Sequence, residues 1–215
     1  MRAMTAARGQ WVGVVLAGVL TVACSKPGST TEVVAGEVEA ERPEPVTEGT
    51  TPTNGCPEGM VPVEGNDTLQ PFCMGETEVS VREFRRCVEA GRCRAFDPTA
   101  DFQDEKKATW LLGDESMPIN YVDEEQARQY CAFVGGRLPT EDEWIWAYGS
   151  AKGWSFPWGN EFSYDTASYC GVWQRPGRPR YHIELCHPKQ YPQDRTRQGV
   201  YEMAGSANEI VGPNE

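Results

Sequence analysis

The residues with the clearest capacity for chemistry lie near the end of the sequence, in the stretch YEMAGSANE from Tyr201 to Glu209. Two carboxylates, those of Glu202 and Glu209, bracket small residues. Backbone carbonyls between them could join both side chains around a hard cation, because such ions prefer oxygen ligands. The alternative is a Gly-Ser turn whose two glutamates are simply solvated. The pattern therefore predicts a metal-binding loop, with an ordinary turn as the competing interpretation.

A second chemically capable residue, Cys24, follows an apolar run that starts at Trp11 and ends in LTVAC. Basic residues, a short apolar run and a small residue before a cysteine resemble a bacterial lipoprotein signal. We therefore expect residues 1–23 to be removed as a signal peptide and Cys24 to carry a lipid. Ser25 after that cysteine indicates a cell-envelope lipoprotein of the outer membrane, held to the membrane by its lipid anchor. An ordinary secretory signal cut nearby is the alternative.

The other cysteines would meet an oxidising compartment after export, where thiols tend to pair. We expect three local bridges, each joining cysteines that flank a turn or a loop: Cys56–Cys73, Cys87–Cys93 and Cys170–Cys186. Each bridge would contribute about 3 kcal/mol by the loop-entropy model. Cys131 then remains unpaired inside an apolar helical stripe, and we interpret it as a buried free thiol that packs as a small hydrophobic side chain.

The composition divides the chain into three parts. Residues 24–55 are rich in Glu, Thr, Pro and Gly and lack aromatic side chains, which is typical of a disordered acidic tether. Residues 56–215 hold nearly all the aromatic side chains and form the predicted domain. The net charge of −12 and the absence of a basic stripe argue against a nucleic-acid partner.

The elements that must position these residues are short. Capping boxes predict three helices, which begin after Ser80, Asp123 and Thr140. Short strands are expected around Met60–Val63, Phe72–Glu78 and Val200–Met203. Residues 92–118 and 150–199 show little periodicity, so the sequence indicates a loop-rich α+β domain pinned by disulfides.

Three separated motifs resemble the sulfatase-modifying-factor family, the formylglycine-generating enzyme domain. They are FCMGETEVSVREFRRCV, then GGRLPTEDEW followed by FPWGNE, and finally GVYEMAGSANEIV. They occur in the family's order and cover the chain from Gly59 to its end. The resemblance implies a variant of the C-type-lectin-like fold with small sheets and much irregular structure.

The same resemblance implies a calcium site in the C-terminal motif. Its ligands would be the side chains of Glu202 and Glu209 and the backbone carbonyls of Gly205 and Ala207. The sequence departs from the family pattern at Glu202, where a shorter Asp or Asn is usual, and at Asn208, which replaces an aromatic residue.

The resemblance does not extend to a catalytic centre. Formylglycine-generating enzymes hold copper with two cysteines that lie beyond the C-terminal motif, and this sequence stops at Glu215 before that region, so we expect no copper and assign no catalytic residue. A related branch uses iron held by three histidines, but this sequence has 2, His182 and His187.

Two functions from different classes follow from these patterns. The first is a membrane-anchored, non-catalytic domain that binds an unidentified protein or small molecule. The second is a fragment of a copper-dependent oxidase acting on a sulfatase cysteine, in which case the domain is incomplete at its C-terminus. An inactive, poorly folding remnant is a third possibility.

Overall fold

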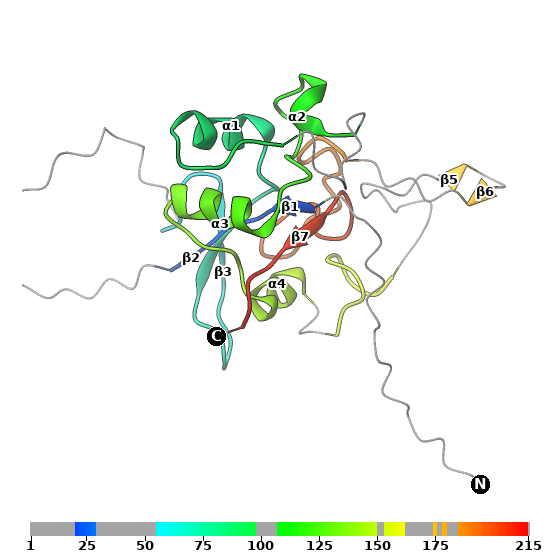
Figure 1. Cartoon of the computed structure of the whole chain (residues 1–215). Helices are drawn as coiled ribbons and strands as arrows, with labels where there is room; N and C mark the ends of the chain where they lie inside the picture. The colour runs from blue at the N-terminus through cyan, green and yellow to red at the C-terminus, as the bar shows by residue number, and fades with distance from the viewer. Residues whose placement is uncertain are drawn as a thin grey trace, which may run out of the picture.

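The computed structural model describes residues 20–28, 55–97, 107–149, 153–161, 174–175, 178–179 and 185–214. These residues form short helices and small sheets joined by long loops, which confirms the predicted α+β class. Figure 1 shows α1 and α2 toward one end of the molecule and α4 toward the other, with α3, β1 and β7 between them. Within the described part of the chain, no helix has the length and apolar character needed to cross a membrane.

The helices begin where the capping boxes place them. Their bounds are Val81–Glu89 (α1), Thr109–Leu112 (α2), Glu124–Phe133 (α3) and Glu141–Tyr148 (α4). Reciprocal side-chain and backbone hydrogen bonds complete the boxes at Ser80, Asp123 and Thr140, so donors at each helix start are satisfied. The short helix α2, which has no side-chain cap, was not predicted.

The strands make three small sheets. Strand β4 (Phe72–Gly75) lies between β2 (Ser25–Pro27) and β3 (Met60–Val63), and both of its neighbours are antiparallel to it. Strand β1 (Leu20–Val22) pairs in parallel with β7 (Asn208–Ile210). Strands β5 (Gln174–Arg175) and β6 (Arg178–Pro179) form a separate antiparallel pair.

Two strand predictions differ from the structure. The strand expected over Phe72–Glu78 ends at Gly75, and the one expected over Val200–Met203 is not formed. The chain instead makes its last strand, β7, beyond the acidic loop. This strand was not predicted because β7 pairs with β1, a segment that is distant in sequence. Local sequence patterns do not indicate such pairing.

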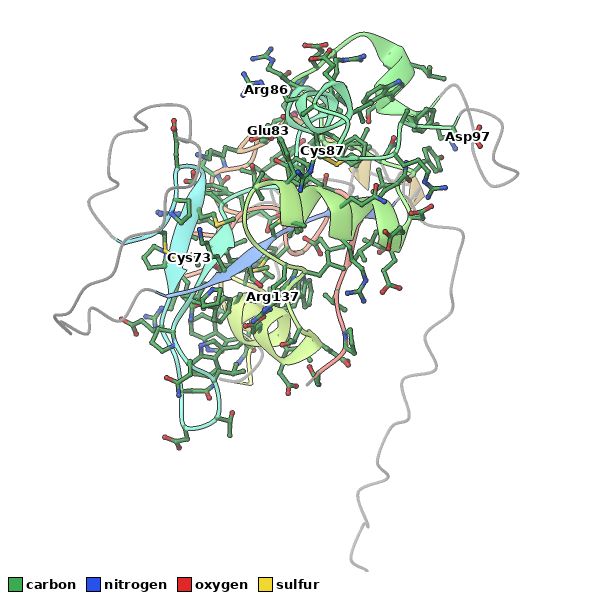
Figure 2. All side chains as sticks on the ribbon, turned by 60° about the vertical axis from the view of Figure 1, so that its left-hand side comes forward. Cys73, Glu83, Arg86, Cys87, Asp97 and Arg137 are labelled. Atoms are coloured by element: carbon green, nitrogen blue, oxygen red, sulfur yellow. A yellow bond between two sulfur atoms is a disulfide. The ribbon has the colours of Figure 1, made fainter. Side chains whose placement is uncertain are left out.

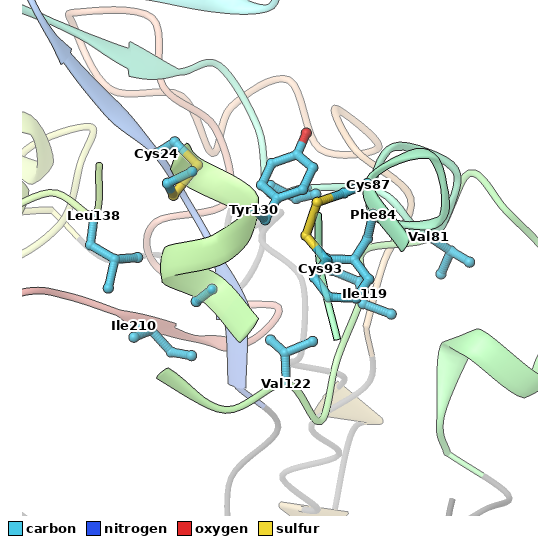
Figure 3. Packing of buried hydrophobic residues seen from close by; sticks show 13 residues of the cluster. Cys24, Val81, Phe84, Cys87, Cys93, Ile119, Val122, Tyr130, Leu138 and Ile210 are labelled. Atoms are coloured by element: carbon cyan, nitrogen blue, oxygen red, sulfur yellow. A yellow bond between two sulfur atoms is a disulfide. The ribbon is translucent and has the colours of Figure 1, made fainter. Parts of the chain in front are cut away.

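The predicted lipid anchor at Cys24 conflicts with the structure. Cys24 is disulfide-bonded to Cys131, so its sulfur has no valence left for a lipid, and Cys131 is not the free thiol that we expected. Figure 3 shows this bridge between the N-terminal strand segment and α3. On one side of Cys24 β1 pairs with β7, and on the other side β2 pairs with β4. Residues 20–28 are therefore part of the folded domain and not of the predicted signal peptide and acidic tether. Residues 1–19 and 29–54 lie outside the described residues.

The other expected bridges agree with the structure where it describes them. Cys56 is bonded to Cys73 and Cys87 to Cys93. Cys186 is also disulfide-bonded, while its expected partner, Cys170, lies outside the described residues. Every cysteine in the described part of the chain is therefore oxidised.

The hydrophobic core has two parts. The larger part packs α1 against α3 around Phe84 and Tyr130, whose rings stack with centroids 6.0 Å apart (Figure 3). The smaller part packs β3 and β4 against α4, through Val63, Met74 and Ala147. Both parts adjoin the last described segment, since Ile210 belongs to the first and Met203 to the second.

A partly buried ion pair holds the linker between α3 and α4 against α4. Arg137, which lies between α3 and α4 (Figure 2), makes two hydrogen bonds of 2.7 Å to the carboxylate of Glu143. Burial tends to raise the pKa of Glu143, but the hydrogen bonds from Arg137 and from the Thr140 amide outweigh burial and lower it. Arg137 also donates to Ser25, so the pair connects β2 with α4.

Removing Arg137 should therefore destabilise the domain. Arg137→Ala leaves the Glu143 side chain, which is 7% exposed, without its charged partner. We expect a loss of about 2 kcal/mol in the free energy of unfolding, measured in urea. Arg128→Ala breaks only a surface pair with Glu124 and should cost less than about 0.5 kcal/mol. Equal losses for both variants would contradict a structural role for Arg137.

Candidate metal centre

The acidic loop, residues 201–209, is held in place by backbone hydrogen bonds to two other segments. The amide of Tyr201 donates to the carbonyl of Glu76, at 2.9 Å, and the amide of Glu202 donates to the carbonyl of Asp194, at 3.2 Å. Glu76 follows β4 directly, and Asp194 lies in the turns that precede the loop. These bonds bring three segments that are separate in sequence to one place.

The backbone of this region adopts conformations that side chains other than glycine rarely take. Glu202 has φ 59°, Ser206 φ 66° and the neighbouring Lys189 φ 62°. Left-handed conformations cost free energy for non-glycine residues, and they persist only where surrounding contacts fix them. The loop is thus held in one defined shape.

Four carboxylates gather here, which we call the carboxylate cluster: Glu78, Asp194, Glu202 and Glu209. Glu78 is 3% exposed, and Asp194 and Glu202 are each 1% exposed. Glu209, in β7, is enclosed against α4, where the indole Nε1–H of Trp144 donates to its Oε2 at 3.1 Å. Such a concentration of buried acids needs compensation, because an ionised carboxylate is strongly disfavoured away from water.

The protein supplies little of that compensation. Neither carboxylate oxygen of Glu78 or of Asp194 has a hydrogen-bond partner among the described residues, nor does Oε2 of Glu202. The Ser206 hydroxyl lies close to Glu78 without completing a hydrogen bond. Oε1 of Glu202 accepts from the Lys189 amide at 2.7 Å, while the Lys189 ammonium group binds Glu76 at 2.6 Å.

The electrostatics of the cluster follow from this burial. Burial, and then repulsion by Glu209 and Glu202, raises the pKa of Glu78 well above its ordinary value. Burial likewise raises the pKa of Asp194 to about 7, of Glu202 to about 7 and of Glu209 to about 8. The charge of Lys189 opposes the shift at Glu202, and the nearby Ala204 amide opposes it at Asp194. The favourable contacts near the cluster are thus too weak to outweigh the burial of its carboxylates.

Two of the four acids, Glu202 and Glu209, are the side chains that the sequence predicted as calcium ligands, and Gly205 and Ala207 lie in the loop between them. Calcium binding by these residues stays a prediction. Glu78 and Asp194 were missed. Glu78 sits in the predicted strand stretch, where an acid would ordinarily face solvent, and Asp194 lies in a segment without periodicity.

The cluster's present geometry is looser than that of a formed metal site. In the described part of the chain, no three His, Cys, Asp and Glu side chains already converge closely enough to hold an ion. Mutual repulsion between uncompensated carboxylates favours separation, so a cation would have to draw the side chains inward by rotation about their bonds. Outside the cluster, His187 contacts Asp114 and Ser116 at the surface, and His182 lies outside the described residues.

Comparison with protein families gives a match over most of the chain. Residues 23–213 match the model of the family described as sulfatase-modifying factor enzyme 1-like domain. This range begins beside Cys24 and includes every residue of the carboxylate cluster. It agrees with the structure in placing Cys24 and β2 within the domain, while β1 lies just before the matched range.

Curated relatives share shorter stretches with the chain. The inactive C-alpha-formylglycine-generating enzyme 2 of Bos taurus is 51% identical over 47 residues, which is 21% of this chain and 16% of that protein. The formylglycine-generating enzyme of Mus musculus is 35% identical over 65 residues, 30% of this chain and 18% of that protein. The Streptomyces coelicolor enzyme of the same name is 34% identical over 65 residues, 30% of this chain and 21% of that protein. The chain thus aligns with less than a quarter of each relative's length.

Proposed function

Because this chain belongs to the sulfatase-modifying factor enzyme 1-like domain family, we propose that it is a non-catalytic binding domain, stabilised by calcium, that works in an oxidising compartment outside the cytoplasm. The observation that carries the calcium assignment is the carboxylate cluster, in which both oxygens of Glu78, both of Asp194 and Oε2 of Glu202 are buried without a hydrogen-bond partner among the described residues. Glu202, Glu209 and the carbonyls of Gly205 and Ala207 are the ligands that the family resemblance implies. Oxygen donors of these kinds suit calcium.

The state of the cysteines supports a non-catalytic role. Copper(I) requires soft thiolate ligands, and a cysteine in a disulfide cannot provide one. All cysteines that the structure describes are disulfide-bonded, so this part of the chain offers no pair of thiolates. The similarity to a relative named as inactive points in the same direction.

The disulfides also support the proposed compartment. Disulfides persist in secreted and periplasmic proteins and are rare in the cytosol, where reductants keep thiols free. The Cys24–Cys131 bridge spans 107 residues of sequence, so it must form on the folded or folding chain in an oxidising environment. Export is the simplest source of such an environment.

A shallow surface recess lies between the end of α4 and the loop before the acidic loop, and aromatic side chains form much of its wall. Its lining side chains include Trp146, Tyr148, Trp154, Arg197 and Gln198. The Arg197 guanidinium lies 5.0 Å from the centre of the Trp154 ring. Aromatic walls with a few polar groups are typical of small-molecule sites.

An oxidase assay tests the non-catalytic assignment. The purified full chain is incubated with copper, a mild reductant, oxygen and a peptide carrying the target cysteine of a sulfatase. We expect mass spectrometry to show no conversion of that cysteine to an aldehyde, whereas the Streptomyces coelicolor enzyme converts the same peptide in parallel. Aldehyde formation that depends on this chain would overturn the proposal in favour of a copper-dependent oxidase.

A further inference from the structure

We propose that Asn66, in the loop that joins β3 to β4, is an attachment site for an N-linked oligosaccharide. This inference rests on the proposed location outside the cytoplasm, because N-linked glycans belong to exported proteins, and it goes beyond the proposed binding function. Its basis is the shape of the loop and the hydrogen bonds of the Asn66 side chain.

The loop has the sequence that N-linked glycosylation requires. Asn66 is followed by Asp67 and Thr68, so a threonine lies two residues after the asparagine and no proline lies between them. No other asparagine of the sequence has Ser or Thr at that spacing. Glu64 supplies the acid, two residues before the asparagine, that bacterial oligosaccharyltransferases also need. Such a motif is only a hypothesis until the structure shows an accessible loop.

The structure places this motif at the surface. Asn66, Asp67 and Thr68 are all exposed. The strands on either side, β3 and β4, pair in antiparallel register, so the loop is the end of a hairpin. Figure 1 shows this connection, in cyan, projecting at the edge of the molecule. A bulky glycan attached there extends into solvent and leaves the core intact.

The Asn66 side chain is held through its oxygen. Oδ1 accepts from the Thr68 amide at 2.8 Å, from the Thr68 hydroxyl at 2.9 Å and from the Leu69 amide at 2.8 Å. Bonds of this kind, from an asparagine side chain to the backbone two residues on, form an Asx turn. Among the described residues, none is hydrogen-bonded to Nδ2, the atom that would carry the sugar.

Other contacts hold the loop in this conformation. The Asn66 amide donates to the Leu69 carbonyl at 2.9 Å. A Cβ atom at Gly65 would lie 2.4 Å from the same carbonyl oxygen, so only glycine fits this close approach. The Trp146 indole donates to the carbonyl of Glu64 at 2.6 Å and ties the start of the loop to α4. The folded protein therefore presents Asn66 without any local unfolding.

The hydrogen bonds at Oδ1 also favour the reaction. An amide nitrogen is a weak nucleophile, because its lone pair is delocalised onto the carbonyl oxygen. Loss of an Nδ2 proton places negative charge on Oδ1, and three donors at that oxygen stabilise this charge. The Thr68 hydroxyl is one of these donors, which gives the threonine of the motif a chemical role.

The reaction is a transfer from a lipid-linked donor, an oligosaccharide joined to a lipid through pyrophosphate. A bond forms between Nδ2 of Asn66 and the anomeric carbon of the first sugar, and the bond from that carbon to the pyrophosphate oxygen breaks. The lipid pyrophosphate leaves with the electron pair, and the Nδ2 proton passes to a base of the oligosaccharyltransferase. No group is oxidised or reduced.

The first experiment incubates the folded, disulfide-bonded full chain with a bacterial oligosaccharyltransferase and its lipid-pyrophosphate-linked oligosaccharide. Asn66→Gln removes the acceptor. Thr68→Ala removes the hydroxyl, and Thr68→Ser keeps it. Asn160→Gln is the matched control, because Asn160 is exposed but has no Ser or Thr two residues later.

We expect mass spectrometry to show one oligosaccharide per chain, on the peptide that contains Asn66. Asn66→Gln should abolish this modification, and Thr68→Ala should lose nearly all of it. Thr68→Ser and Asn160→Gln should be modified as wild type is. The inference is wrong if wild-type protein gains no glycan, gains it on another residue, or gains it only after unfolding in urea.

Protein isolated from the cells that make it separates this inference from the proposed compartment. A glycan on Asn66 together with oxidised cysteines supports both. Oxidised cysteines with an unmodified Asn66 overturn the inference and leave the compartment standing. Reduced cysteines overturn the compartment, and the glycosylation that depends on it.

Discussion

We expect saturating calcium to raise the melting temperature of the metal-free protein by about 5–10 °C at pH 8 and by much less at pH 5. An ion that binds only the folded state at one hundred times its dissociation constant stabilises that state by about 2.7 kcal/mol. For a domain of this size, each kcal/mol corresponds to a shift of about 2–4 °C. The carboxylate cluster is thus expected to have a large effect on the melting temperature.

The pH dependence follows from the direction of the pKa shifts. Burial raises the pKa of Asp194 and Glu202 to about 7 and of Glu209 to about 8, whereas unfolded carboxyl groups titrate near pH 4, at about 3.9–4.3. A raised pKa in the folded state stabilises the protein fully below about pH 4, and this contribution is lost as pH rises to about 8. The free energy of unfolding of the metal-free protein therefore falls over that pH window. Over the same window more carboxylates become ionised and can bind calcium.

Differential scanning calorimetry at pH 5 and pH 8, with calcium, magnesium or a chelator, measures both effects. Magnesium is the control, because it demands a compact octahedral site and gives up its water reluctantly. We expect magnesium to shift the melting temperature far less than calcium at the same concentration. A calcium shift that is equal at both pH values, or that magnesium reproduces, would contradict a calcium site in the cluster.

The second large effect is expected at the Cys24–Cys131 bridge. It closes a loop with a sequence separation of 107, against 6 for Cys87–Cys93. The loop-entropy model gives about 5 kcal/mol for the long bridge and about 2 kcal/mol for the short one. Replacing both members of each pair with serine should therefore reveal unequal losses in the free energy of unfolding.

Urea unfolding of the two double variants, Cys24→Ser with Cys131→Ser and Cys87→Ser with Cys93→Ser, measures the difference. Losing the long bridge should also release β1 and β2, which hydrogen-exchange measurements would detect as faster exchange in β7. Alkylation of wild-type protein unfolded in urea, without a reductant, should label neither Cys24 nor Cys131, because bridged sulfurs stay protected when the chain unfolds. If Cys131 is labelled, or if the long bridge stabilises the protein less than the short one, the Cys24–Cys131 bridge and its predicted contribution are wrong.

The local part of the fold could be predicted from sequence. Capping boxes located the starts of α1, α3 and α4 because they need only residues within one turn of helix. The strand Met60–Val63 has the bounds that were expected, and the bridges Cys56–Cys73 and Cys87–Cys93 join cysteines close together in sequence.

The distant contacts could not be predicted in this way. The apolar run before Cys24 has the composition of a leader, and nothing in it indicates the parallel pairing of β1 with β7. That pairing places Cys24 beside α3, where Cys131 was expected to be a free thiol. The predicted calcium ligands included only Glu202 and Glu209 of the carboxylate cluster for the same reason, since Glu78 and Asp194 reach the loop only through the tertiary fold.

A crystal structure of the protein grown with calcium, with anomalous scattering recorded, tests the central claim most directly. The account predicts one anomalous peak among the carboxylates of Glu78, Asp194, Glu202 and Glu209, with calcium–oxygen distances of about 2.3–2.6 Å. It would be contradicted if saturating calcium left the cluster without a peak and its carboxylates bonded only to water or to one another.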